Sequence, residues 1–390
     1  MKRANLGPSL ILIGLAAFFG FRYFQPPVQS TPHLIFAILF AGSGLLGLIN
    51  LLPRRWVNIA LNVGISLFFL DFVFAEIDLR EVGAALAEAN YLMLIPSTIF
   101  VILHMYFRTL RWQWLLKPLG EVSFWPAFRG LVIGITGNAL LPARAGEFIR
   151  AYVLGRRTGL SKSGIFATQV VERIFDGLTV LLVLLAVIIW GVQDEVLKTA
   201  GIIGGIFYVG AMAALFLFMT KRHWIDAIIN KFVPQKWAEP IVDLLDGFGS
   251  GLAVLKNPGQ LAMVTLWNML TWVMIPISFW FALQAFDFGV AVPWQAAVLM
   301  LPMMALGLTI PGAPGGVGAV QAAVKLTLDI TFAGLAVGPN FVETVAAATI
   351  VIHASQFVPE IIPGIASFFY EGLTPGDISA GRSMASGEAG

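Results

Sequence analysis

The stretch N-A-L-L-P-A-R-A-G-E-F-I-R at residues 138–150 is followed, after a basic linker, by an apolar run that contains V-E-R-I-F-D at residues 171–176. These motifs place five charged side chains in or beside segments composed like lipid-buried helices: Arg144, Glu147, Glu172, Arg173 and Asp176. A charge near the bilayer centre costs about 2.5–3.5 kcal/mol on insertion scales, so such residues usually face a protein interior or a wet cavity. The cluster predicts a substrate site; the alternative is an ion-pair network that only joins helices.

The composition of the whole chain is that of a helical membrane protein. Of its 390 residues, 58% are hydrophobic and 12% are charged, whereas about a quarter of the residues of a soluble domain are charged. Apolar blocks of membrane-spanning length predict an all-α, polytopic integral membrane protein with about eight transmembrane helices. The expected spans are residues 6–23, 33–52, 57–75, 91–107, 164–190, 199–220, 261–283 and 342–369. Pro276 is expected to kink the seventh span, and the last to be tilted or broken near Pro359 and Pro363.

Basic residues set the predicted orientation. Residues 108–162 carry nine Lys or Arg against two acids, and residues 221–256 add five bases, whereas the loop at 76–90 is acidic. Cytoplasmic loops are rich in Lys and Arg. We therefore place the N-terminus, both basic stretches and the C-terminus in the cytoplasm of a multi-pass protein of the cell (inner or plasma) membrane. Residues 76–90 and 285–293 are then external.

Two apolar segments fit poorly as complete spans. Residues 130–141 end at Pro142, and the segment 294–310 is interrupted by P-G-A-P-G-G-V-G at 311–318. We expect each segment to enter the membrane and return as a re-entrant helical hairpin, because helices broken by Gly and Pro are tolerated where they line a cavity or are buried. The two hairpin units are inverted copies in topology, which is a recurring plan of transporters.

The first hairpin offers groups that bind phosphate. Pro142 interrupts the helix and Gly146 permits close backbone approach, so the turn can present free N–H groups at the start of the helix that carries Glu147. A helix N-terminus attracts phosphate, and the planar fork of Arg144 suits it. The alternative is that Arg144 pairs with Glu147 and pins the hairpin.

Glu172 and Asp176 lie four residues apart on one helical face. In the functional interpretation they receive an ammonium group or carry a proton; in the structural one they neutralise Arg144, Arg150 or Arg173. Both hold at once if the ion pairs exchange partners.

The second hairpin supplies further candidates. Its backbone groups lack helical partners, and the candidate residues are Pro311, Gly315, Gly316, Gly318 and Gln321. Lys325 and Asp329 at i,i+4 predict an internal ion pair, and His353 is expected to be packed and hydrogen-bonded. Arg108 and Arg111, with Trp112 and Trp114, fit an interfacial anchor, with recruitment of an anionic headgroup by Arg108 as the alternative.

The remaining segments complete the expected layout. Residues 1–76 form N-terminal transmembrane helices, and residues 91–369 form the core. Within the core, residues 221–258 predict one or two amphipathic helices, either in the cytoplasmic interface or as solvated surface helices. Residues 374–390 are expected to be a disordered tail. No nucleotide-binding loop or metal–nucleotide pair is found, so no cofactor or metal is expected, and the basic segments fit anionic lipid and not nucleic acid.

Four motifs in this order, R-T-L-R-W at 108–112, P-A-R-A-G-E at 142–147, V-E-R-I-F-D at 171–176 and P-G-A-P-G-G-V-G at 311–318, resemble the flippase-type transmembrane domain of lysylphosphatidylglycerol synthases. The family includes stand-alone membrane proteins, and the resemblance covers residues 91–369. It implies movement of a modified phospholipid or related amphiphile between leaflets, with functional roles for the five charged residues and the glycines of the second hairpin. The soluble aminoacyl-transfer domain is missing, and Gln321 stands where a glutamate is expected.

Three functions follow as expectations. The first is a translocase for a phospholipid or a polyprenyl-phosphate-type amphiphile, which makes a lipid-linked anion its partner. The second is a membrane-embedded transferase that acts on a lipid headgroup. The third is a scaffold for a separate lipid-modifying enzyme. A homo-oligomer is compatible with each.

Overall fold

The computed structural model describes residues 5–24, 31–74, 77–141, 145–190, 195–222, 224, 235–310, 312–374 and 376. Within these ranges every regular element is helical, which confirms the predicted all-α class. Three candidate residues, Pro142, Arg144 and Pro311, and nearly all of the predicted tail lie outside the described residues. The chain forms two compact units, which are described in turn.

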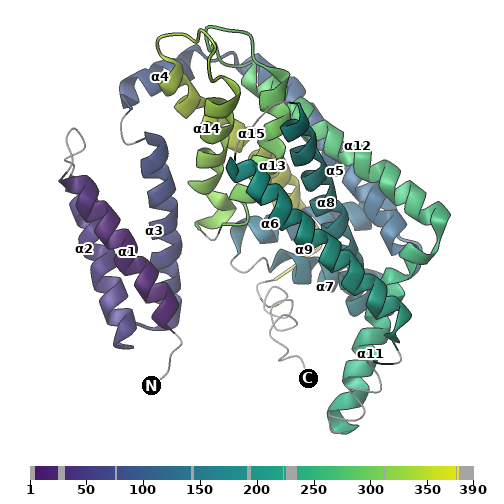
Figure 1. Ribbon diagram of the computed structural model, residues 1–390. Helices are drawn as coiled ribbons and strands as arrows, with labels where there is room; N and C mark the ends of the chain where they lie inside the picture. Colours follow the sequence, from purple (N-terminus) through teal and green to yellow (C-terminus); the bar gives the residue numbers. More distant parts are fainter. Residues whose placement is uncertain are drawn as a thin grey trace. The chain divides into compact units, whose positions relative to one another are not determined.

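The first unit contains Met1–Leu92, Ala282–Ala296 and Met303–Ala354. Its helices α1 (Leu6–Tyr23), α2 (Thr31–Leu48) and α3 (Arg54–Phe74) pack side by side around an apolar core that includes Phe19 and Phe40 (Figure 1). The acidic loop predicted at 76–90 is in fact mostly helix α4 (Leu79–Glu88). This helix forms because the Asp78 side chain accepts a hydrogen bond from the Arg80 N–H at its start.

The second predicted hairpin lies largely in the first unit. Helix α13 (Trp294–Gly307), the short 3-10 turn η5 (Pro314–Gly316) and helix α14 (Ala319–Thr331) follow one another. A side chain at Gly307 would approach the backbone of Ala319 to 3.0 Å, so glycine is what lets α13 and α14 meet closely. The turn rests on α3, whose Ser66 hydroxyl accepts a hydrogen bond of 2.7 Å from the Ala313 N–H.

The second unit contains Met93–Phe281, Ala297–Pro302 and Ser355–Gly390. Its elements are η2 (Tyr91–Met93) leading into α5 (Leu94–Leu116), then α6 (Phe124–Leu140), α7 (Gly146–Thr158), α8 (Lys162–Ile189), α9 (Glu195–Thr220), α11 (Gln235–Gly251), η4 (Leu252–Lys256) and α12 (Pro258–Leu283). Within the predicted amphipathic segment the structure describes α11, which packs against α8 (Figure 1).

Helices α6 and α7 form an antiparallel hairpin along a seam of glycines. A side chain at Gly137 would lie 2.8 Å from the Gly146 Cα, and one at Gly134 would lie 2.9 Å from the Arg150 Cβ. Gly146 is equally restricted, because a side chain there would meet the Gly134 carbonyl and the Asn138 backbone. The close packing at the seam therefore fixes the position of Arg150 and its neighbours along the axis of α6.

Six described helices are long and apolar enough to cross a membrane. They are Leu6–Tyr23, Arg54–Phe74, Tyr91–Leu116, Leu197–Thr220, Pro258–Leu283 and Phe341–Tyr370. This supports a multi-pass membrane protein, while the count of eight spans and the re-entry of both hairpins stay predictions. Helix α15 (Phe341–Tyr370) continues through Pro359 and Pro363, so the last span is not broken at either proline. Helix α12 likewise continues through Pro276.

Candidate functional site

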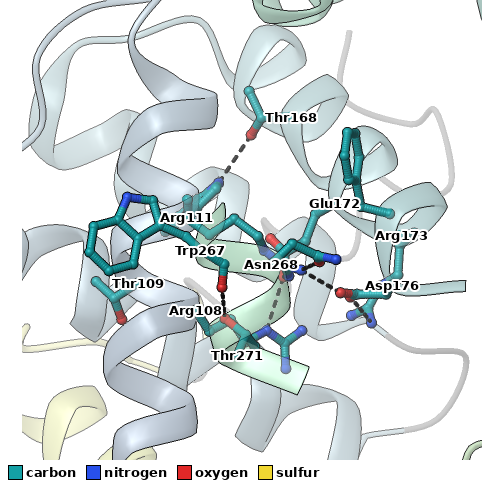
Figure 2. A network of polar contacts seen from close by, with 12 residues as sticks. Arg108, Thr109, Arg111, Thr168, Glu172, Arg173, Asp176, Trp267, Asn268 and Thr271 are labelled. Atoms are coloured by element: carbon teal, nitrogen blue, oxygen red, sulfur yellow. Dashed lines mark hydrogen bonds and ion pairs between the residues drawn. The ribbon is translucent and has the colours of Figure 1, made fainter. Parts of the chain in front are cut away.

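The centre of the site is a carboxylate buried between three arginines. Glu172 of α8 has a side chain that is 1% exposed. Its Oε1 accepts a hydrogen bond of 3.0 Å from Arg108 Nε and lies 3.1 Å from Arg111 Nη2, both on α5. Its Oε2 lies 2.9 Å from Arg150 Nη2 of α7. One acid from α8 therefore joins three helices (Figure 2).

Asp176, one helical turn further along α8, extends this network to α12. Its Oδ1 accepts hydrogen bonds from Arg111 Nη1 at 2.6 Å and from the Trp272 indole N–H at 3.0 Å. Arg111 Nη1 also donates to Asn268 Oδ1, and Asn268 Nδ2 donates to Thr179 Oγ1 at 2.7 Å. Figure 2 labels Arg111, Asn268 and Asp176 within this network. Asn268 thus fixes the position of a fully buried guanidinium.

Helical spacing explains why these groups meet. On α5, the polar residues Ser97, His104, Arg108 and Arg111 follow at intervals of seven, four and three, which places them on one face. Helix α12 faces this stripe, since Ser278 Oγ lies 2.9 Å from Ser97 Oγ and His104 Nδ1 bonds the Thr271 carbonyl at 3.0 Å. Together with the Arg111–Asn268 bond, these contacts tie α5 to α12 over about 21 Å, at a rise of about 1.5 Å per residue.

Arg150 is held by an aromatic face as well as by an acid. Its guanidinium carbon lies 3.5 Å from the centre of the Trp112 ring, a cation–π geometry. Trp112 is oriented in turn by its indole N–H, which donates to Thr168 Oγ1 at 3.0 Å. Both Trp112 and Arg150 are buried. The sequence R-T-L-R-W at 108–112 therefore supplies two arginines to the network and the ring that supports a third.

The network reaches solvent or lipid at the start of α7. Arg173 Nε donates to Glu147 Oε1 at 2.9 Å and its Nη1 lies 3.7 Å from Asp176 Oδ2. The Arg173 side chain is 40% exposed, in contrast to the fully buried Arg111. Gln169 Nε2 donates to the Glu147 carbonyl at 3.1 Å and so fixes the first turn of α7 on α8. A partly exposed pair, Glu147 and Arg173, therefore borders the buried cluster.

Several buried donors of this cluster lack hydrogen-bond partners. Among the described residues, Nε of Arg111 and Nε of Arg150 have no hydrogen-bond partner. The Arg150 Nη2 and Glu172 Oε2 atoms are close, but they are misaligned for a hydrogen bond, so their attraction is an ion pair only. Buried guanidinium groups normally satisfy their donors. An arginine cluster with unused donors can accept a phosphate or a carboxylate.

The structure brings together four of the predicted site residues, Glu147, Glu172, Arg173 and Asp176, and places Gly146 in the seam of the hairpin. The structural interpretation that the acids neutralise Arg150 and Arg173 is confirmed by their ion pairs. The interfacial-anchor prediction is wrong for Arg111 and Trp112, since both are buried. Arg108, whose side chain is 12% exposed, pairs with the buried Glu172. Sequence reasoning also missed Asn268 and Trp272, which become recognisable only once α12 faces α5.

The described candidates of the second hairpin lie in the first unit and have structural partners. Gln321 Oε1 accepts a hydrogen bond from the Gly318 N–H at 2.7 Å, and its Nε2 lies 2.9 Å from His353 Nδ1. His353 Nε2 bonds the Gly315 carbonyl at 3.0 Å, which assigns the ring proton to Nε2 because a carbonyl only accepts. The chain Gly318–Gln321–His353–Gly315 closes the turn.

Glycine is required in this turn because three residues have φ between +72° and +91°. They are Gly315, Gly316 and Gly318. A side chain at Gly318 would also collide with the backbone of Ser66. The predicted ion pair between Lys325 and Asp329 is confirmed at 2.6 Å.

Comparison with known proteins identifies the family. The model of a family described as "Lysylphosphatidylglycerol synthase TM region" matches residues 59–364, which include both hairpins and the whole arginine network. The chain belongs to the lysylphosphatidylglycerol synthase transmembrane family. The resemblance inferred from the four motifs is thereby confirmed. No solved structure gives a significant match to this family member.

Curated relatives of this family member include a protein named glycosyltransferase AglD from Haloferax volcanii, which is 26% identical over 390 aligned residues. That match covers 89% of the chain but only 62% of AglD. A UPF0104 membrane protein of Methanocaldococcus jannaschii is 23% identical over 78% of the chain and 91% of its own length. Another, from Methanothermobacter thermautotrophicus, is 25% identical over 75% of the chain and 89% of its own length. Stand-alone transmembrane proteins therefore occur among the relatives of this family member.

Proposed function

We propose that this protein moves an amphiphile with a phosphate-bearing headgroup between the leaflets of the cell membrane, and that the arginine network of the second unit is the headgroup site. One observation carries the proposal. The described part of a lipid-embedded helix bundle holds two buried arginines, Arg111 and Arg150, and each retains an Nε donor without a hydrogen-bond partner. Burying such charges is costly in a membrane, so they usually mark a substrate path.

The arrangement suggests how a headgroup is received. The phosphate enters past the exposed Arg173 and Glu147, and takes the free donors of Arg150 while Glu172 keeps Arg108 and Arg111. The acyl or prenyl chains stay in the bilayer. Three arginines face two acids, Glu172 and Asp176, so one phosphate charge completes the neutralisation of the site. After the headgroup leaves, acids that exchange between the arginines limit the uncompensated buried charge. Arg144, which the sequence predicts to bind phosphate and which lies outside the described residues, is included in the same proposal.

The experiment is a reconstituted translocation assay. The purified full chain is placed in vesicles that contain a fluorescent phospholipid, and a membrane-impermeant quencher reports the lipid that has changed leaflet. We expect Arg150→Gln to abolish translocation and Arg156→Gln, an exposed position on the same helix, to leave it unchanged. Full translocation by a folded Arg150→Gln protein would remove the assigned role. Translocation that fails for phospholipids but proceeds for a polyprenyl phosphate would assign the lipid class.

A second candidate function is headgroup transfer. The relative named a glycosyltransferase is the observation that favours it. The same vesicles distinguish the two, because a transferase changes the mass of its lipid and a translocase does not. Mass spectrometry of the lipids after incubation with candidate headgroup donors therefore distinguishes a transferase from a translocase. A scaffold for a separate enzyme would show neither activity alone and would gain one on addition of a membrane extract.

A further inference from the structure

A second charged cluster, which shares no residue with the buried network, lies where α15 ends. Glu371 Oε1 accepts a hydrogen bond of 2.5 Å from Arg129 Nε of α6, and Oε2 accepts one of 2.9 Å from Arg157 Nη1 of α7. One carboxylate thus joins both helices of the α6–α7 hairpin. The Glu371 side chain is 7% exposed, although it follows the last turn of a helix.

The backbone of α15 is built to deliver this carboxylate. Gly372 takes φ +60°, and the N–H groups of Gly372 and Leu373 bond back to the carbonyls of Phe369 and Phe368 at 3.1 and 3.2 Å. This is a Schellman-type helix end, which turns the chain back on itself. The turn buries Leu373 in a cluster with Ile133, Ile149 and Val153 of the hairpin. We call residues 368–373 the strap.

The surroundings of the strap place it at the level of lipid headgroups. Phe369 and Tyr370 are 74% and 70% exposed, and exposed aromatic residues at the end of a spanning helix gather at the membrane–water interface. The Tyr370 ring also stacks on Arg129 at 4.5 Å. Arg157 has a side chain that is 45% exposed, so an anion arriving from the membrane surface can reach it.

We propose that Arg129 and Arg157 form an anion-binding site that the strap occupies with its own carboxylate, and that the phosphate of an anionic phospholipid replaces Glu371 and releases the strap. A phosphodiester offers two oxygens to two guanidinium groups, as the carboxylate does here. Basic pockets on the cytoplasmic side of membrane proteins hold such headgroups. Release of the strap uncovers the apolar cluster under Leu373 and frees the hairpin that carries Glu147 and Arg150.

Single-cysteine labelling tests this proposal, since the chain contains no cysteine. Val153→Cys places a thiol under the strap, and Thr374→Cys places one at an exposed position as control. The full chain is reconstituted in phosphatidylcholine vesicles with or without phosphatidylglycerol and treated with a neutral, membrane-permeant maleimide. We expect phosphatidylglycerol to speed labelling of Val153→Cys about fivefold and to leave Thr374→Cys unchanged. Equal labelling of Val153→Cys in both vesicles would overturn the proposal.

Two further arms identify the ligand and the site. In the Glu371→Gln background, Val153→Cys should label fast in both kinds of vesicle, because the strap has lost its carboxylate. Continued slow labelling would contradict the proposal that Glu371 holds the strap in place. Native mass spectrometry should show more bound phosphatidylglycerol on Glu371→Gln than on the parent, and less on the double variant Arg129→Gln/Arg157→Gln. Unchanged binding of phosphatidylglycerol to the double variant would show that Arg129 and Arg157 do not form the lipid-binding site. Acceleration by inorganic phosphate in phosphatidylcholine would exclude a lipid as the required ligand.

Discussion

Arg150 and Trp112 form a buried stack, with 3.5 Å between the guanidinium carbon and the centre of the indole ring. A cation–π contact that is desolvated contributes about 2 kcal/mol or more, so the ring offsets part of the cost of burying the charge. The stack also leaves the edge of the guanidinium to Glu172 and to any incoming anion. The sequence places these two residues 38 positions apart, and they meet because α6 packs against both α5 and α7.

Replacing Arg150 with lysine tests whether charge alone is enough. Lysine keeps the charge but loses the planar fork that stacks on Trp112 while facing Glu172. We expect Arg150→Lys to lower the free energy of unfolding by about 2 kcal/mol and to reduce lipid translocation. Thermal unfolding in detergent and the vesicle assay measure the two effects. The matched variant Arg156→Lys, on the exposed side of α7, should have the stability and translocation of the parent. Equal stability and translocation of Arg150→Lys and Arg156→Lys would contradict the assigned role of the Arg150–Trp112 stack.

Neutralising Glu172 removes the acid shared by three arginines. The variant Glu172→Gln leaves Arg108, Arg111 and Arg150 without their common partner, and removing one member of a buried ion pair costs about 3–5 kcal/mol. We expect a large drop in the unfolding temperature. Glu81→Gln, at an exposed position on α4, is the control and should change stability by less than about 0.5 kcal/mol. A normal unfolding temperature for Glu172→Gln would show that the network does not hold the unit together.

The hairpin seam makes a prediction about a single methyl group. Alanine at Gly146 would collide with the Gly134 carbonyl and with Asn138, which forces α6 and α7 apart and costs about 1–3 kcal/mol. Gly210→Ala on α9 has open space around the new methyl group and should be neutral or slightly stabilising. Comparison of the two unfolding curves is the measurement. Similar unfolding curves for the two variants would mean that α6 and α7 can move apart without a loss of stability.

A variant at Gln321 tests whether this residue of the second hairpin has a structural role or a binding role. The variant Gln321→Leu leaves the Gly318 N–H and His353 Nδ1 without their partners, each at about 1–3 kcal/mol. We expect lower thermal stability but unchanged translocation per folded molecule. Loss of translocation at full stability would instead assign Gln321 to the substrate.

Orientation is testable because the chain lacks cysteine. We expect Glu121→Cys and Ser161→Cys, which flank the antiparallel α6–α7 hairpin, to react with an impermeant maleimide from the cytoplasmic side. Glu88→Cys and Ala291→Cys should react only from outside. All four positions are exposed. Labelling of Glu121→Cys and Ser161→Cys from opposite sides would contradict the predicted topology.

The sequence predicted the fold class and the first span well, because long apolar blocks have few alternatives to helices. The prediction 6–23 coincides with α1. Boundaries set by charge were less reliable. The fourth span was predicted to end at residue 107, whereas α5 continues to Leu116. That error moved Arg108 and Arg111 to the membrane surface, although both lie within α5 and pair with the buried Glu172.

Only part of the site could be predicted from the sequence. Glu172 and Asp176 stood out as acids in an apolar helix, and their spacing placed them on one face. Their partners come from α5, α7 and α12, and helix pairing of this kind is decided by tertiary packing. The four-and-three spacing of His104, Arg108 and Arg111 was the available signal, since surface anchors need no common face. The Gln321–His353 contact, 32 residues apart, had no such signal.

The shared ion pairs also constrain how the protein is made. Arg108 precedes Glu172 by 64 residues, so at ordinary synthesis rates α5 waits roughly 3–13 s for its acids to emerge from the ribosome. During that interval its two arginines have no native counter-charge, and α8 in turn enters the membrane with acids that α5 must already be positioned to receive. Because α5 precedes α8 in the chain, we expect α8 to insert beside an α5 that is already in place.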